Sequence, residues 1–253
     1  MKHGNFILEA CVDSPESAAA AQIGGADRLE LCGHLIIGGV TPDEWLFRKV
    51  KEVCELPVRV LIRPRFGDFC YTDYEFELMK MQVRHFRELG ADAVVIGCLQ
   101  PDGSLDMQRM EHLVDLAGNM EVTLHRAFDV CRDPYEALEQ AIELGIGTIL
   151  TSGQESSCMK GQECLKKLQQ QSNGRITLMA GAGVNADVIE ALYRSTGLRA
   201  YHMSGKRTGD SVMQYRREGV PMGLPGISEY EIWRTDAAEI QRAAAVMSKF
   251  PKK

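Results

Sequence analysis

The chain has 253 residues, of which 45% are hydrophobic and 25% are charged, as in an ordinary globular protein. Its 29 Lys and Arg against 35 Asp and Glu leave a formal net charge of -6, which argues against nucleic acid or an anionic membrane as the main partner. The opening stretch MKHGNFILEACVDSPE contains no run typical of a signal peptide, and no segment approaches the ~20 apolar residues of a membrane span. We therefore expect a cytoplasmic protein.

Short apolar runs alternate with amphipathic stretches along the chain. The runs occupy residues 6–14, 28–33, 58–65, 91–98, 121–129, 147–153, 176–184 and 200–207. The stretch after Thr72 and Asp73 ends in Gly90, which is typical of a capped helix, and Pro42 and Pro134 fit first-turn positions of helices. Strands regularly followed by helices predict an α/β fold, a single (β/α)8 TIM barrel over residues 1–253. A doubly wound open sheet is the alternative, but it would not require such even repetition.

An internal repeat favours the barrel. Four segments begin with a helix-ending glycine and continue into an apolar run that ends in a small residue. They are G-ADRLELCG, G-ADAVVIGC, G-IGTILTSG and G-LRAYHMSG, starting at Gly25, Gly90, Gly145 and Gly197. Their spacing of about two strand–helix units predicts that they are the even-numbered strands.

The alternation of side chains predicts which residues face the barrel interior. In RLELC, Leu29 and Leu31 should pack outward on helices, so Glu30 and Cys32 point inward. The stretch LEAC repeats this pattern with Glu9 inward. Extended to the other strands, the same register places further side chains inward: Cys11, Arg28, Arg63, Arg65, His125 and His202.

These charged groups should meet near the carboxyl ends of the strands, where TIM barrels carry their sites. Buried charges must be paired, and the two glutamates and two arginines could neutralise each other. A purely structural cluster of ion pairs is the alternative to a functional site. The location at the carboxyl ends favours the site.

The loops after the seventh and eighth strands suggest an anion-binding site, because these loops often bind phosphate in barrels. The candidate residues are Gly181, Gly183, Ser204, Gly205 and Lys206. Glycines in tight turns and solvated basic residues are the alternative. Loops 33–42 and 66–73 could cover the barrel mouth, and segment 208–233 is expected to be a lid or a subunit contact.

Two chemistries fit this set of residues. Cys11 and Cys32 are candidate Cu(I) ligands, because Cu(I) prefers sulfur and a nearby Arg65 would favour thiolates. The alternative is an isomerase, aldolase or lyase acting on a small phosphorylated or carboxylate substrate. In that case Glu9 or Glu30 would be a base, His125 an acid or base, and Arg63 and Arg65 anion clamps.

With these residues assembled, the chain resembles the CutC family, named for copper homeostasis. The resemblance is carried by LEACVDS, GGADRLELC, GGVTP, IRPRFGDFCYTDYE, TLHRAFD, LTSGQ and MAGAGV, within residues 7–217. In the family, the stretch that corresponds to IRPRFGDFCYTDYE usually has glycine where this chain has Phe66. The resemblance implies a cytoplasmic (β/α)8 barrel that forms a homo-oligomer, with a dimer favoured, and copper ligands at Cys11 and Cys32.

Overall fold

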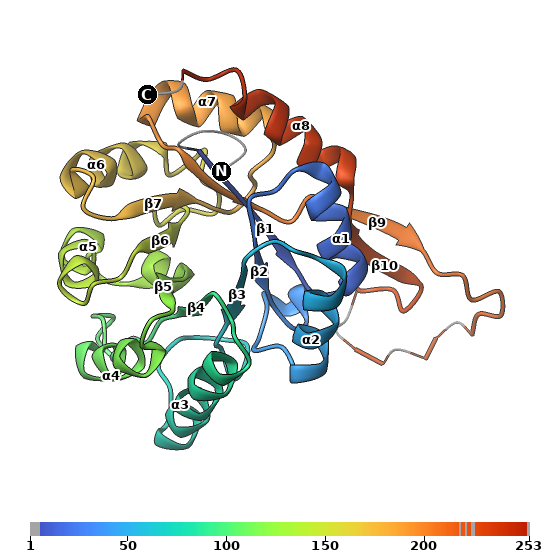
Figure 1. The fold of residues 1–253 in the computed structure, drawn as a ribbon, viewed down its shortest axis with the longest axis horizontal. Helices are drawn as coiled ribbons and strands as arrows, with labels where there is room; N and C mark the ends of the chain where they lie inside the picture. The colour runs from blue at the N-terminus through green and yellow to red at the C-terminus, as the bar shows by residue number, and fades with distance from the viewer. Residues whose placement is uncertain (1–5, 218, 221, 224–225, 252–253) are drawn as a thin grey trace.

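The computed structural model describes residues 6–217, 219–220, 222–223 and 226–251. Eight parallel strands close into a barrel in sequential order (Figure 1), which confirms the predicted fold and excludes an open sheet. The strands are β1 (Ile7–Val12), β2 (Arg28–Leu31), β3 (Val58–Leu61), β4 (Ala93–Ile96), β5 (Glu121–Leu124), β6 (Thr148–Thr151), β7 (Thr177–Ala180) and β8 (Ala200–Met203).

A ring of helices surrounds this barrel (Figure 1). The α-helices are α1 (Pro15–Gly24), α2 (Glu44–Val53), α3 (Asp73–Glu88), α4 (Met107–Ala117), α5 (Pro134–Glu143), α6 (Gln162–Ser172), α7 (Ala186–Thr196) and α8 (Ala237–Met247). Two short 3-10 helices, η1 (Leu35–Ile37) and η2 (Arg126–Val130), lie in the loops after β2 and β5. Among the described residues, no helix is long and apolar enough to span a bilayer.

Local capping explains where several helices begin. Thr72 accepts a hydrogen bond from the backbone N–H of Glu75, whose side chain accepts one from the backbone N–H of Thr72, forming a capping box for α3. Pro134 occupies the first turn of α5, as predicted. The same prediction for Pro42 is wrong, because Asp43 caps α2 and the proline precedes the cap.

The predicted alternation of side chains holds for the first two strands. Leu29 and Leu31 are fully buried in the main hydrophobic core, while Glu9 pairs in register with Arg28, and Cys11 with Glu30. The barrel interior also contains two small apolar groups apart from that core. They are Cys32, Leu61 and Val95, and Leu150, Met179 and Ala200. Polar and apolar side chains therefore share the interior.

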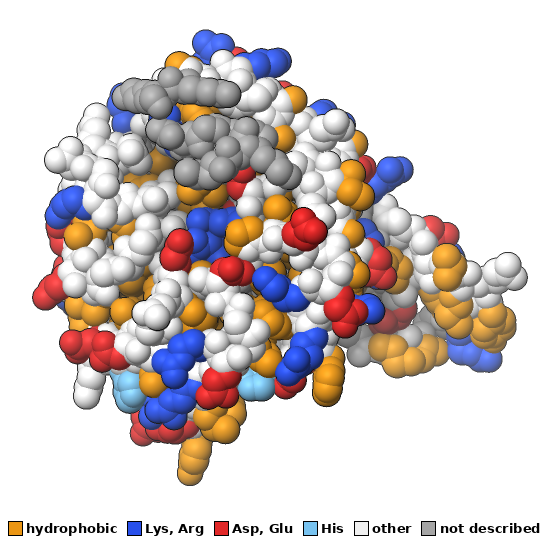
Figure 2. Space-filling model, viewed as in Figure 1, with side chains coloured by type: hydrophobic (Ala, Val, Ile, Leu, Met, Phe, Trp, Pro, Cys, Tyr) orange, Lys and Arg blue, Asp and Glu red, His pale blue; other side chains and the backbone are white. Residues whose placement is uncertain are grey.

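Between β8 and α8 the chain forms an arm that projects from the barrel (Figure 1). Strands β9 (Lys206–Asp210) and β10 (Glu231–Thr235) pair antiparallel at its base. Hydrophobic side chains gather on the arm in Figure 2, and Val212, Tyr215 and Met222 are largely exposed. This arm contains most of segment 208–233, although residues 218, 221 and 224–225 lie outside the described residues. Its role as a lid or subunit contact stays a prediction.

Candidate functional site

A cavity of about 530 Å³ opens at the barrel mouth. Among the residues that line it are Cys11, Glu30, Arg63, His125, His202 and Ser204. These side chains come from the ends of β1, β2, β3, β5 and β8 and from the segments that follow them. The strands therefore converge on one site, as the sequence predicted.

Glu9 is the centre of a buried ion-pair cluster. Its Oε2 accepts a hydrogen bond from Arg28 Nε at 2.6 Å and lies 3.6 Å from Arg59 Nε, while its Oε1 lies 2.8 Å from His202 Nδ1. Burial alone would raise the pKa of Glu9, but Arg28 and His202 hold it at about 2. The Glu9 carboxylate is therefore ionised at neutral pH.

The expectation that Arg63 and Arg65 neutralise the glutamates is wrong. The cationic partners of Glu9 are Arg28, Arg59 and His202. Arg59 also contacts Thr123 and forms an ion pair with Glu121 near the opposite end of the barrel. Arg59 was not among the predicted site residues, although its position two residues before Leu61 could have indicated the interior face.

His202 is a buried cation. Burial lowers its pKa, but Cys11 and Glu30 beside it, and hydrogen bonds with Cys11 and Glu9, raise the pKa well above the usual value. The imidazole is therefore protonated at neutral pH. This cation, and not Arg65, is the positive group beside Cys11.

Glu30 differs from Glu9 because it forms no direct ion pair with a Lys, Arg or His side chain among the described residues. Its Oε1 accepts a hydrogen bond from Cys32 Sγ at 3.4 Å, and its buried Oε2 has no partner. Burial and the neighbouring Glu9 raise the pKa of Glu30, although His202 opposes them. Ligand atoms of Glu9, Glu30 and His202 lie within 4.8 Å of one another, a grouping that could hold a metal ion.

The two predicted thiol ligands are both neighbours of Glu30. Cys11 pairs with Glu30 across β1 and β2, lines the cavity and interacts with His202. Cys32 follows the end of β2 and is only 1% exposed. Burial, together with Glu30 and Cys11, raises the pKa of the Cys32 thiol well above its usual value. Both cysteines are reduced.

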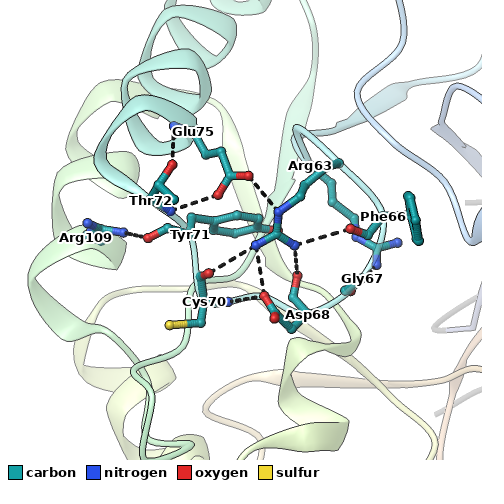
Figure 3. A network of polar contacts seen from close by, with 10 residues as sticks. Arg63, Phe66, Gly67, Asp68, Cys70, Tyr71, Thr72, Glu75 and Arg109 are labelled. Carbon is teal, nitrogen blue, oxygen red and sulfur yellow. Dashed lines mark hydrogen bonds and ion pairs between the residues drawn. The ribbon is translucent and has the colours of Figure 1, made fainter.

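Arg65 does not point into the barrel, so its predicted inward orientation is wrong. Its guanidinium donates to Glu75 Oε1 at 2.6 Å, to Asp68 Oδ1 at 2.9 Å and to the carbonyl of Cys70 at 3.1 Å. Figure 3 shows these partners around the loop that connects β3 to α3. The strand ends at Leu61, and beyond it the alternation of a β-strand no longer sets side-chain direction.

Arg63 and His125 form the other side of the mouth. The Arg63 guanidinium donates to the carbonyls of Gly38, Gly39 and Gly67 and lies 4.9 Å from the Phe69 ring. The centroids of the Phe69 and His125 rings are 4.8 Å apart. Loops 33–42 and 66–73 therefore both contribute to the mouth, as predicted.

Only two of the five predicted anion-binding residues line the cavity. Gly183 and Ser204 line the cavity, whereas Gly181, Gly205 and Lys206 are not among its lining residues. A Cβ at Gly181 would lie 2.7 Å from Leu150, and one at Gly205 would lie 2.8 Å from Ile240, so both glycines serve close packing. Lys206 stacks 3.3 Å from the Trp233 ring centroid.

Two further residues that were not predicted line the cavity from the loop after β5: Arg126 and Asp129. Asp129 accepts hydrogen bonds from Thr151 and Ser152 and pairs with Arg126 at 2.7 Å. The sequence RAFD, which follows His125 directly, could have indicated these two charged residues at the mouth. Asp129 is already neutralised, so it ties this loop to the end of β6.

Comparison with known proteins shows the family of this chain. The CutC family matches residues 6–207, so the chain belongs to the CutC family. A Histophilus somni protein with the name "family protein CutC" is 44% identical over 233 residues. The match covers 92% of this chain and 96% of that protein. The human "Copper homeostasis protein cutC homolog" is 41% identical over 242 residues, covering 95% of this chain and 89% of that protein.

Solved structures show the same architecture. The crystal structure of a CutC protein from Streptococcus agalactiae has a TM-score of 0.75 and 28% identity, covering 79% of this chain and 98% of that one. The thiamine phosphate pyrophosphorylase of Pyrococcus furiosus, with a TM-score of 0.55 and 15% identity, covers 97% of this chain and 96% of that one. The latter likeness shows the barrel fold alone.

Proposed function

We propose that this chain is a cytoplasmic copper-handling protein that binds Cu(I) through Cys11 and Cys32. The observation that carries the proposal is that two free thiols at the ends of neighbouring strands both neighbour Glu30, Cys11 by strand register and Cys32 by a hydrogen bond. Human and mouse relatives are named as copper homeostasis proteins, which supports the same function.

The donor set suits Cu(I), which takes soft sulfur ligands at low coordination number. Cys11 lies at the cavity, which provides a route for the ion. Cys32 is buried with its thiol proton directed at Glu30 Oε1, and this proton must leave the protein for Cys32 to bind the ion as a thiolate. The cation His202 beside Cys11 offsets the negative charge of a bound thiolate pair.

The test is an anaerobic Cu(I) titration of the reduced protein against a competing chelator. The wild type should bind one ion tightly, and Cys11→Ala/Cys32→Ala should lose that binding. Cys54→Ala is a matched control, because Cys54 is also buried but lies after α2, away from the mouth. Weak wild-type binding, or equal binding by the double variant, would refute the proposal.

A second candidate function is an enzyme acting on a small phosphorylated or carboxylate substrate at the same mouth. The observation that favours it is the set of unpartnered polar atoms on residues that line the cavity: Glu30 Oε2, Arg63 Nε and His125 Nε2. A copper site at Cys11 and Cys32 makes no use of Arg63 or His125. Binding of small anions to the metal-free protein tests this candidate.

A further inference from the structure

Arg63 is a buried cation without a carboxylate partner among the described residues, unlike the interior arginines Arg28 and Arg59. Only 9% of Arg63 is exposed, and the three bonds to backbone carbonyls come from Nη1 and Nη2. A buried charge without a counter-charge is costly, so the site favours an anion supplied from outside.

The free donors of Arg63 indicate the shape of that anion. A guanidinium has five N–H donors, and three of them donate to backbone carbonyls here. The remaining donors are Nε–H, which has no partner, and one Nη2–H. The nitrogens Nε and Nη2 share one edge of the planar group, and such a pair of donors matches the two oxygens of a carboxylate.

His125 adds a second, neutral donor. Its Nδ1 accepts a hydrogen bond from the backbone N–H of Ala127 at 3.1 Å, so the neutral ring carries its proton on Nε2. That Nε2 is buried and has no partner. Burial and the charge of Arg63 lower the pKa of His125 to about 3, which keeps the ring neutral at physiological pH.

The surrounding structure holds the two donors in place. Phe69 contacts both the Arg63 guanidinium and the His125 ring. Gly97 leaves room for that ring, because a Cβ there would lie 2.5 Å from His125 Cε1. Donors fixed by packing are typical of a built binding site.

We infer that Arg63 and His125 form a binding site for a small carboxylic acid that carries a carbonyl or hydroxyl oxygen next to the carboxylate. Arg63 takes the carboxylate, and His125 Nε2–H donates to the adjacent oxygen. This inference rests on the second candidate function and names its substrate class. Of the other charged groups at the cavity, Asp129 is paired with Arg126, and Glu30 faces the cation His202.

The test uses oxalate, pyruvate and inorganic phosphate as probes of the metal-free protein. Calorimetry measures affinity, and nitrogen-15 spectra of the histidine rings report on the His125 Nε2–H signal. Oxalate and pyruvate should bind and shift that signal. Arg63→Gln should weaken both about 10-fold to 100-fold, the range expected from charged hydrogen bonds. Arg48→Gln, on the exposed face of α2, is the matched control.

His125→Asn provides a second variant, because an asparagine oxygen can accept the same backbone bond from Ala127. It should weaken pyruvate binding about 10-fold while the protein stays folded. Absence of oxalate and pyruvate binding would overturn this site, and absence of phosphate binding as well would overturn the second candidate function. If Arg63→Gln leaves the affinity unchanged and the ligands do not shift the His125 Nε2–H signal, this site alone would be overturned. Equal binding of phosphate, independent of His125, would overturn the assigned substrate class.

Discussion

His202 Nδ1 lies 2.8 Å from Glu9 Oε1 and joins the last strand of the barrel to the first. Glu9 is fully buried and reaches Arg28 on β2 with its other oxygen. One carboxylate thus links three neighbouring strands, β8, β1 and β2, on the side of the mouth that carries both candidate copper ligands. Replacement of Glu9 should therefore disturb both the closure of the barrel and the site.

Glu9→Gln should destabilise the fold strongly. Removing one partner of a buried ion pair leaves Arg28 and His202 without their counter-charge, which costs about 3–5 kcal/mol of unfolding free energy. Chemical denaturation measures the change. Glu44→Gln serves as the control, because Glu44 pairs with Arg48 on the surface and should matter little. Equal effects of the two substitutions would contradict the role assigned to Glu9.

His125 should make the protein less stable as the pH falls. Its folded pKa is about 3, against an ordinary value of 6.5, so between these values only the unfolded chain takes up the proton. The unfolding free energy should fall on acidification through this window, by up to about 1.4 kcal/mol per pH unit from this group. Denaturation at several pH values should show a shallower slope for His125→Asn. The same slope in both proteins would refute a lowered pKa.

Cu(I) affinity should rise with pH if Cys32 is a ligand. The pKa of the Cys32 thiol is raised by burial and by Glu30, so binding must displace its proton at neutral pH. Each displaced proton makes the affinity rise about tenfold per pH unit. Chelator competition at several pH values measures the slope, and Cys32→Ala should reduce it. An unchanged slope would show that Cys32 is not the group deprotonated.

Gly97→Ala should displace the His125 ring. The new Cβ would lie 2.5 Å from Cε1 and 2.6 Å from Nδ1, so we expect an overpacking cost of about 1–3 kcal/mol. Gly147→Ala is a matched control, because a Cβ there would lie 3.8 Å from the Val122 carbonyl oxygen, an ordinary van der Waals contact. Pyruvate binding should weaken only in the first variant. Thermal unfolding and calorimetry together check both effects.

Arg65→Ala should loosen the loop over residues 66–75 and leave Cu(I) binding unchanged. The Arg65 side chain connects Asp68 and Cys70 to Glu75 in the first turn of α3. Amide hydrogen exchange should therefore accelerate there, with Arg48→Ala as the surface control. Loss of Cu(I) binding without faster exchange would restore Arg65 to the site.

The sequence by itself determined the barrel. Evenly spaced apolar runs, helix-ending glycines and the internal repeat depend only on local patterns, and the eight parallel strands follow them. The alternation RLELC likewise determined that Glu30 and Cys32 face away from Leu29 and Leu31, because side chains of a strand alternate between its two faces.

Only the tertiary structure decided how the charged groups pair. Arg63 and Arg65 are two residues apart, so the alternation of a strand would place them on the same face. Strand β3 ends at Leu61, however, and the loop then directs Arg65 toward Glu75. The true partners of Glu9 come from β2, β3 and β8, because closure of the barrel brings them together. Spatial proximity across a closed sheet depends on register and strand length, which no local pattern specifies.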